Sequence, residues 1–199
     1  MIAPPPAVIL AGGRARRMGG GDKVLLDLCG KPLLAHVIDR MQPQCGEMAI
    51  SANGDATRFA AFGLPVLPDA VPDFPGPLAG ILAGMEWAAA RGAKVVISVA
   101  GDTPFLPATL IQALAEVAGP DGLALAAERV GENTRTHPVI GQWPVSLRHP
   151  LHEALLRGER KIMPFAQAHG ARTTLFDADD TAFLNINTPQ DLSRAVSAR

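Results

Sequence analysis

The stretch Val8-Ile-Leu-Ala-Gly-Gly-Arg-Ala-Arg-Arg-Met-Gly-Gly-Gly-Asp-Lys23 carries the most structural information in this chain. Its apolar start has the length of a strand and runs directly into two glycines, and the loop behind them contains three arginines, three consecutive glycines and a closing lysine. Glycines let backbone N–H groups approach an oxyanion without a Cβ in the way, and Arg and Lys neutralise its charge. The stretch therefore predicts a strand followed by a loop that binds a polyphosphate, such as a nucleoside triphosphate.

Two common phosphate-binding patterns do not fit this loop. A Walker A loop ends in Gly-Lys-Ser or Gly-Lys-Thr, whereas Lys23 is followed by Val24. The dinucleotide-binding fingerprint needs Gly-x-Gly-x-x-Gly, and the glycines at 12–13 and 19–21 do not have that spacing. A surface loop with solvated arginines is the simplest alternative, but the position directly behind a buried strand favours a binding loop.

The spacing that does fit is Leu-Ala-Gly-Gly at 10–13, Arg-Met-Gly at 17–19 and Asp-Lys at 22–23. It resembles the signature of the nucleotidyltransferase superfamily, which includes sugar-phosphate, cytidylyl and molybdenum cofactor nucleotidyltransferases. The variant found here looks most like the molybdenum cofactor guanylyltransferases, because the related cytidylyltransferases usually carry Leu-Ala-Ala-Gly and Pro-Lys at the matching places. The resemblance covers nearly the whole chain.

Length and composition are those of a globular protein. The 199 residues are 48% hydrophobic and carry a net charge of −1, so no general attraction to nucleic acid or to a membrane surface is expected. Cys29 and Cys45 are too few for a disulfide framework or a zinc site. The N-terminus lacks the features of a signal peptide, and no apolar run is long enough to span a membrane. We therefore expect a cytoplasmic protein.

Apolar segments of strand length alternate with segments of helical period. Strands are expected at 7–10, 47–51, 65–67, 94–100, 122–128, 137–141 and 173–176, and helices at 32–41, 56–62, 77–91, 107–118, 147–156, 161–169 and 188–198. This alternation predicts an α/β fold with a mostly parallel central sheet and helices on both faces. The most apolar run, 94–100, is expected to form a central strand.

No linker divides the chain, so residues 1–199 are expected to form a single domain. The resemblance implies a Rossmann-like nucleotidyltransferase domain, with a GTP-binding part at roughly 7–110 and an acceptor-binding part at roughly 111–199. In such sheets, ligands bind at the carboxyl ends of the strands. Gly12, Asn53, Asp69 and Asp102 each directly follow an expected strand, which predicts that they meet at one edge.

Asp102 is the strongest candidate for a metal ligand. In the segment Val99-Ala-Gly-Asp-Thr-Pro-Phe-Leu106, Asp102 stands just after the end of the expected buried strand. A carboxylate at this position can hold Mg²⁺, which prefers hard oxygen ligands and bridges phosphate oxygens. The alternative is an Asp that caps the following helix or forms a turn. The resemblance agrees with the metal interpretation, because the family's Gly-Asp-x-Pro segment carries the magnesium aspartate.

Lys23 is predicted to contact the triphosphate and to stabilise charge on the leaving pyrophosphate, and Arg17 could act in the same way. The resemblance implies that the backbone of Leu10, Ala11, Gly12 and Gly13 lines the nucleotide pocket. The segment that ends at Gly80 looks like the family's Gly-Pro-Leu-Ala-Gly element, whose small residues would lie against the nucleotide.

Recognition of the base is assigned by resemblance to Asn53 and Asp69, the positions that the family uses for GTP contacts. A carboxylate or carbonyl would accept hydrogen bonds from the N–H groups of guanine. Both residue types are also common in turns, so from the residues alone an ordinary turn is the stronger interpretation.

The second half of the chain is expected to bind the acceptor. A pterin monophosphate is anionic, which makes Arg157, Arg160 and Lys161 candidate phosphate partners, although a solvated helix terminus explains them equally well. Asn-Ile-Asn-Thr-Pro at 185–189 resembles a family motif near the C-terminus. The wider superfamily has a carboxylate there as a second metal ligand, whereas here Asn185 and Asn187 offer only amides. Asn187 is the candidate for that second ligand, and Asn185 is a further candidate for binding the acceptor.

The resemblance implies transfer of GMP from Mg·GTP to the phosphate of molybdopterin or of the molybdenum cofactor, with release of pyrophosphate. The substrates would be GTP and the molybdenum cofactor, and Mg²⁺ the metal. It also implies transient contact with the molybdenum-insertion proteins. Two alternatives stay open: a cytidylyl or sugar-phosphate nucleotidyltransferase, and a nucleotide-binding regulatory module without turnover.

Overall fold

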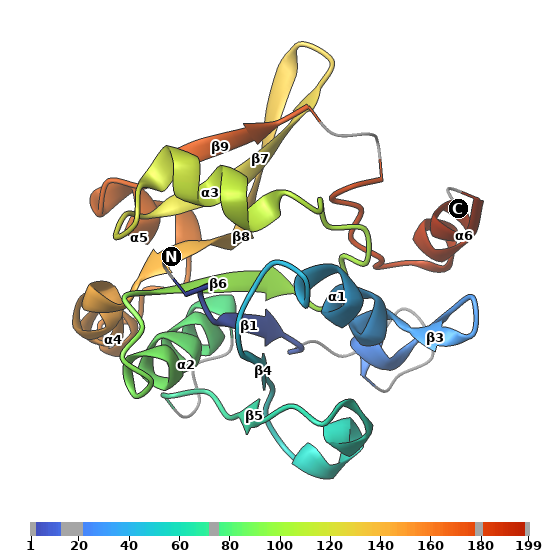
Figure 1. Ribbon diagram of the computed structural model, residues 1–199, viewed down its shortest axis with the longest axis horizontal. Coiled ribbons are helices and arrows are strands. Elements are labelled where there is room, and N and C mark those ends of the chain that lie inside the picture. The colour runs from blue at the N-terminus through green and yellow to red at the C-terminus, as the bar shows by residue number, and fades with distance from the viewer. Residues whose placement is uncertain (1–2, 13–21, 72–75, 178–180, 198–199) are drawn as a thin grey trace.

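The computed structural model describes residues 3–12, 22–71, 76–177 and 181–197. Its main sheet has seven strands in the order β5-β4-β1-β6-β8-β7-β9, and a separate two-stranded sheet pairs β2 with β3 (Figure 1). The strands are β1 Ala7–Leu10, β2 Asp27–Leu28, β3 Lys31–Pro32, β4 Met48–Ser51, β5 Val66–Leu67, β6 Val95–Ala100, β7 Ala124–Val130, β8 Asn133–Pro144 and β9 Arg172–Phe176.

The main sheet is mixed but mostly parallel, as predicted. Strands β1, β4, β5 and β6 pair in parallel, as do β7 and β9, whereas β8 is antiparallel to both β6 and β7. Strand β6 lies in the middle of the order, which confirms the expectation for the most apolar run. The pairing of β6 with β8 joins strands from the two halves of the chain.

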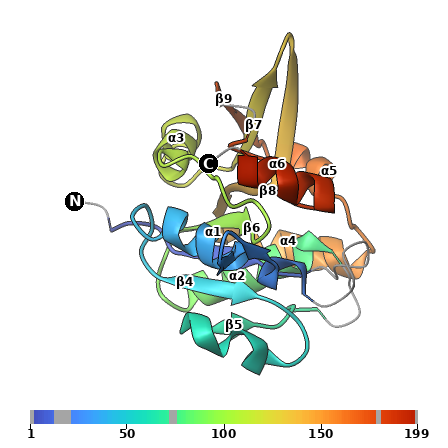
Figure 2. The ribbon, with the colours of Figure 1, turned by 90° about the vertical axis from the view of Figure 1, so that its right-hand side faces the viewer.

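Helices cover both faces of the sheet (Figures 1 and 2). They are α1 Leu33–Met41, α2 Pro77–Ala89, α3 Leu110–Ala118, α4 Arg148–Leu156, α5 Ile162–Ala168 and α6 Pro189–Ser197, with 3₁₀ turns η1 Lys23–Leu25, η2 Ala56–Phe62 and η3 Val145–Leu147. Because side chains alternate along a strand, Ile9 packs into a core with α1 and α3, while Val8 packs into another with α2, α4 and α5.

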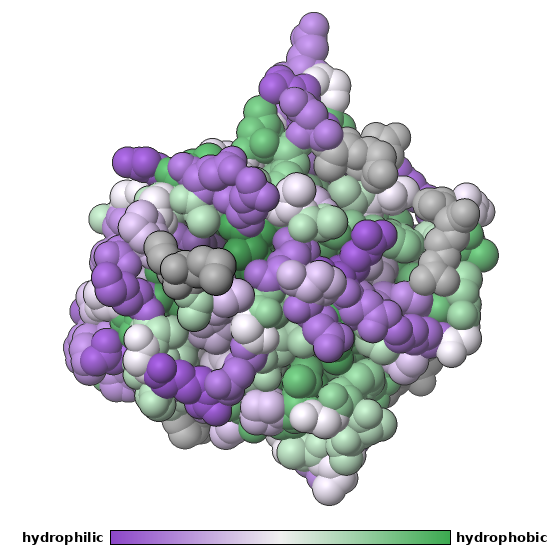
Figure 3. Space-filling view, viewed as in Figure 1, coloured by the Kyte–Doolittle hydropathy of each residue, from purple (hydrophilic) through white to green (hydrophobic). Residues whose placement is uncertain are grey.

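The largest departure from the expected elements is the β7–β8 hairpin. Strand β8 begins at Asn133 rather than near His137, because residues 133–136 continue the ladder with β7. These residues are polar and the first three are exposed, so they carry no apolar alternation that would mark a strand. The hairpin protrudes from the body of the molecule, and hydrophilic residues cover its tip (Figures 1 and 3).

Helix α3 also begins later than expected, at Leu110 instead of Pro107. The side chain of Gln44 explains this start, because its amide donates to the carbonyl of Pro107 at 3.0 Å and accepts from the N–H of Ile111 at 3.2 Å. A residue in the turn after α1 therefore satisfies backbone groups at the start of α3, and the local sequence of α3 gives no sign of this contact.

Helix α6 packs against the β2–β3 hairpin at the C-terminal end of the described chain. The short strands of this hairpin were not predicted. Leu28, Leu33, Ile186 and Ala195 form a small buried cluster between the helix and the hairpin. The cluster fixes the segment in front of α6, which carries two of the candidate site residues. No helix in the described residues is long and apolar enough to cross a membrane.

Candidate functional site

The first candidate residues follow β1 at the carboxyl edge of the parallel strands. The N–H of Ala11 donates to the carbonyl of Ser51 at 2.9 Å, and the N–H of Gly101 donates to the carbonyl of Leu10 at 2.9 Å. These bonds continue the sheet past the strand ends and hold the loops after β1, β4 and β6 together. Gly12 is exposed, and a Cβ added there would meet no atom within 4 Å.

The described chain resumes at Asp22, which forms an ion pair with Arg58 at 2.6 Å. Arg58 also donates to the carbonyl of Asn53 at 2.6 Å. It therefore links the end of the glycine-rich loop to the loop after β4, a role that no motif in the sequence signals. Gly13 and Arg17, both predicted for the nucleotide site, lie outside the described residues.

Lys23 stands at the centre of the site. Its ammonium contacts Asp102 Oδ2, Asn187 Oδ1 and, at 2.8 Å, Asn185 Oδ1. Its side chain is only 11% exposed, so its charge is largely withdrawn from water. The oxygens around this one cation therefore come from residues that lie 79 to 164 positions after Lys23 in the sequence.

The loop after β6 fixes Asp102. The backbone carbonyl of Asp102 accepts from the N–H of Ile186 at 3.0 Å, which fastens the Asn185–Asn187 segment to the same loop. A Cβ at Gly101 would come within 2.9 Å of Val24 and 3.1 Å of the Leu10 carbonyl oxygen, so only glycine fits between these elements. The carboxylate makes an ion pair with Lys23 and does not cap a helix.

Asp102 also has an oxygen that is free to bind a further group. Its Oδ1 is buried and has no hydrogen-bond partner among the described residues. Such an atom is costly unless something binds to it, and a hard cation suits a carboxylate with amide oxygens nearby. The chemistry of these donors fits Mg²⁺, although no cluster of three His, Cys, Asp or Glu side chains exists in the described part of the chain.

Asn53 and Asp69 lie side by side after β4 and β5. The amide of Asn53 donates to Asp69 Oδ2 at 2.6 Å, and its carbonyl oxygen accepts from the N–H of Asp69 at 2.9 Å. Burial raises the pKa of the Asp69 carboxyl, and the hydrogen bond from Asn53 offsets only part of this effect. The structure therefore brings the two predicted base-contacting residues together as one oriented pair.

Gly80 faces the sheet beneath α2. A Cβ there would come within 2.5 Å of Ser51 Oγ and 3.0 Å of Leu10, and at Gly84 the nearest atom is a methyl carbon of Val8, also at 2.5 Å. Both glycines let α2 pack closely on β1 and β4, which confirms the expectation of close approach at this helix. The space that Gly80 provides is filled by the strands.

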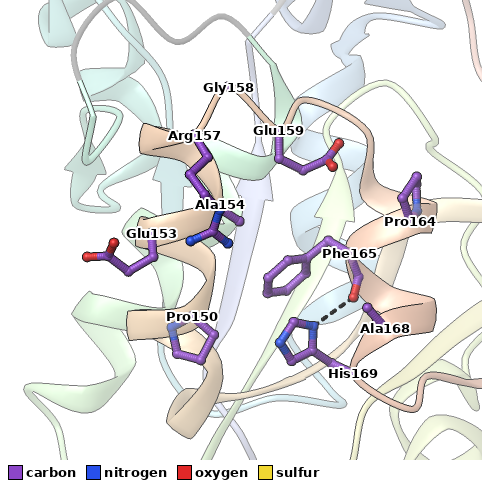
Figure 4. A pocket seen from close by; sticks show the side chains of 10 residues that line it. All are labelled: Pro150, Glu153, Ala154, Arg157, Gly158, Glu159, Pro164, Phe165, Ala168 and His169. Carbon is purple, nitrogen blue, oxygen red and sulfur yellow. Dashed lines mark hydrogen bonds between the residues drawn. The ribbon is translucent and has the colours of Figure 1, made fainter.

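The acceptor candidates do not lie together. Asn185 contacts Lys23, whereas Arg157, Arg160 and Lys161 are exposed between α4 and α5. Arg157 lines a cavity of 480 Å³ there, together with Glu153 and Glu159 (Figure 4). A different cavity, of 570 Å³, is lined by Asn185 and Asn187.

Known proteins resemble this chain over almost its whole length. The family model described as "MobA-like NTP transferase domain" matches residues 7–175. A molybdenum cofactor guanylyltransferase from Cereibacter sphaeroides is 50% identical over 190 residues, which cover 96% of this chain and 94% of that protein. One of the same name from Bradyrhizobium sp. (strain ORS 278) is 49% identical over 196 residues, covering 96% and 91% of the two chains.

Solved structures show the same fold. The crystal structure of molybdopterin-guanine dinucleotide biosynthesis protein A from Archaeoglobus fulgidus superposes with a TM-score of 0.77 at 25% identity and covers 97% of each chain. A nucleotidyl transferase from Methanothermobacter gives a TM-score of 0.73 at 21% identity, over 98% of this chain and 97% of that one. The chain therefore belongs to the family of MobA-like NTP transferases, in the group of molybdenum cofactor guanylyltransferases.

Proposed function

We propose that this protein transfers GMP from Mg·GTP to the phosphate of molybdopterin or of the molybdenum cofactor, giving a guanine dinucleotide cofactor and pyrophosphate. Relatives about 50% identical over 96% of the chain carry the guanylyltransferase name. The observation that carries the proposal is the cluster of Lys23 with Asp102, Asn185 and Asn187. It joins the loop after β1, the loop after β6 and the C-terminal segment at one point.

The reaction needs little acid–base chemistry. A phosphate monoester is already an oxyanion near pH 7, so an oxygen of the acceptor phosphate forms the new bond to the α-phosphorus of GTP. The bond from the α-phosphorus to the bridging oxygen breaks, and pyrophosphate leaves with the electron pair. The protein's contribution is to position the two phosphates and to neutralise the developing charge.

Lys23 is the group best placed to neutralise that charge. In the structure its ammonium is held by oxygens of the protein, and phosphate oxygens are the same kind of partner. We expect Lys23 to exchange some of these contacts for the triphosphate when GTP binds. Arg17 remains a proposed second cation on the glycine-rich loop.

Mg²⁺ is the proposed metal, with Asp102 Oδ1 as its protein ligand and the Asn187 amide oxygen as a candidate second ligand. When bound, Mg²⁺ would draw charge from the phosphate oxygens and hold them in a fixed geometry. The buried, unpartnered Oδ1 atom supports this assignment.

The guanine base is assigned to Asn53 and Asp69. Their mutual hydrogen bonds fix both side chains, and Asp69 Oδ1 makes no hydrogen bond within the described residues, so it can accept from the N–H groups of guanine. The backbone of Leu10, Ala11, Gly12 and Gly13 is the proposed lining of the pocket. Gly80 is proposed to help by keeping α2 close to this edge.

A nucleotide panel tests the choice of base. The melting temperature is measured with Mg²⁺ and each of GTP, CTP, ATP and UTP at equal concentration. A shift for GTP alone is expected, because only guanine offers adjacent N–H donors to Asp69. A shift for CTP would instead favour a cytidylyltransferase, and Mg·GTP binding without pyrophosphate release from any acceptor would favour a regulatory module.

A further inference from the structure

A cavity of 570 Å³ lies beside the Lys23 cluster and has no role in the reaction as described so far. Asn185 and Asn187, which both contact Lys23, form one part of its lining, and residues of the β7–β8 hairpin form another. The volume lies in the range of small-molecule sites. A ligand in this cavity would therefore reach the proposed site of phosphate transfer.

The cavity contains a carboxylate that is almost entirely removed from water. Glu128 lies on β7, and its side chain is 9% exposed. Arg135 and His137 both contact its Oε1 atom, at 3.3 and 3.2 Å, and no partner among the described residues contacts Oε2. Glu128 lines the cavity, so Oε2 is available to accept hydrogen bonds from N–H donors of a ligand there.

An aromatic pair stands next to this carboxylate. The rings of His137 and Phe183 stack with centroids 4.6 Å apart and planes 14° from parallel, and both residues line the cavity. The ladder between β7 and β8 shifts between Leu125 and Ala126, so that His137 pairs with Ala126. Such an irregularity redirects side chains on the bulged strand, and here it accompanies a flat aromatic surface beside Glu128.

We propose that this cavity holds the pterin ring of the acceptor and that Glu128 Oε2 accepts hydrogen bonds from its 2-amino-4-oxo edge. The inference rests on the proposed function for the identity of the acceptor. A flat heterocycle suits the aromatic surface, and the adjacent N–H and amino donors of that edge match a carboxylate. The cavity at Arg157 suits the ring less well, because its lining does not include the Lys23 cluster.

Direct binding of two stable probes tests this assignment. Fluorescence quenching of 6-carboxypterin is measured alongside 6-carboxylumazine, in which a carbonyl replaces the 2-amino group. The wild-type protein is expected to bind the pterin at least about tenfold more tightly, because a hydrogen bond to a charged group contributes about 1.5–3 kcal/mol. Equal binding of the two probes, or no binding of the pterin at millimolar concentration, would overturn the proposal.

The Glu128→Gln variant is expected to lose this preference and to bind the pterin about 10- to 100-fold more weakly. Glu132→Gln is the matched control, since Glu132 is exposed at the turn of the same hairpin, and it should bind like the wild type. Unchanged pterin binding by a folded Glu128→Gln variant would overturn the assignment. If that variant does not fold, Glu128→Asp and the two-probe comparison on the wild type decide the question.

The thermal shift by Mg·GTP, measured on the same proteins, separates this inference from the proposed function. It is expected to be the same in the wild type and in Glu128→Gln. Loss of the GTP shift in Glu128→Gln with intact pterin binding would mean that the carboxylate contacts guanine, whose edge has the same donors, and would refute the proposal. Absence of a GTP shift in the wild type, with selective pterin binding, would count against the proposed nucleotide and leave the pterin site standing.

Discussion

Three side chains contact the ammonium of Lys23, and only one of them, Asp102, is charged. The positive charge of Lys23 therefore neutralises the negative charge of Asp102. A divalent ion that approaches this cluster alone meets a site with no net charge, whereas the triphosphate brings several negative charges with it. We therefore expect free metal to bind weakly and to bind well together with the nucleotide.

The Lys23→Met variant tests this balance of charge. Without nucleotide, it should bind Mn²⁺ at least about tenfold more tightly than the wild type, because a unit charge a few ångströms from a divalent ion costs several kcal/mol at an effective dielectric constant of about 20. Its turnover should fall by about 10²–10³-fold, the scale of losing one charge-stabilising group. Titration by Mn²⁺ electron paramagnetic resonance measures the affinity, with Lys31→Met as an exposed control. Equal metal affinity in variant and wild type would contradict this role of Lys23.

At the scale of single elements, helix α2 depends on its glycines. An added Cβ at Gly84 would lie 2.5 Å from a methyl carbon of Val8, in the middle of β1. Gly84→Ala should therefore lower the free energy of unfolding by about 1–3 kcal/mol, as for other overpacked cores. Chemical denaturation measures the loss. Gly12→Ala is the control, since its Cβ meets nothing within 4 Å, and equal stability of the two variants would show that α2 does not need close approach.

The start of helix α6 is stabilised by hydrogen bonds to Asp191. Its Oδ2 accepts from the N–H groups of Asn187 and Thr188 at 2.9 and 2.8 Å, and the hydroxyl of Thr188 accepts from the N–H of Asp191 at 3.2 Å. Burial tends to raise the pKa of Asp191, but these hydrogen bonds outweigh it and lower the pKa below the usual range. The stabilisation is therefore present above the unfolded-state pKa and is lost as the pH falls through the lower, folded-state pKa.

Asp191→Ala should cost about 1 kcal/mol at pH 7, the usual contribution of a helix cap, and less in acid, where the wild type loses the same bonds. Melting temperatures of both proteins across pH 3–7 measure this convergence, with Gln190→Ala as the control. A constant difference across that range would contradict the ionised cap.

The elements that could be predicted from sequence are those whose burial follows a simple period. Strand β6 and helix α1 carry continuous or helically spaced apolar residues, and both were found within a residue of the expected bounds. The tip of the β7–β8 hairpin and the β2–β3 sheet could not be predicted. Their strands are exposed or two residues long, so backbone pairing rather than an apolar pattern defines them.

At the scale of the whole molecule, the parallel strands bring the separate sequence motifs together. The strand ends at Leu10, Ser51, Leu67 and Ala100 share one edge, as predicted from the candidate residues that follow these strands. The contact between Lys23 and the Asn185–Asn187 segment could not be predicted from sequence, because it depends on how α6 packs on the β2–β3 hairpin. The ion pair of Arg58 with Asp22 is likewise a product of folding that no local motif marks.

Transfer of the α-phosphate is the central chemical claim, and labelled GTP tests it most directly. The protein is incubated with Mg²⁺, molybdopterin prepared under anaerobic conditions, and GTP labelled either at the α- or at the γ-phosphorus. The α-label should appear in a guanine dinucleotide product and the γ-label in pyrophosphate, and Asp102→Asn should lose the transfer while remaining folded. Label from the γ-phosphorus in the pterin product, or transfer at the wild-type rate by Asp102→Asn, would contradict guanylyl transfer at this site.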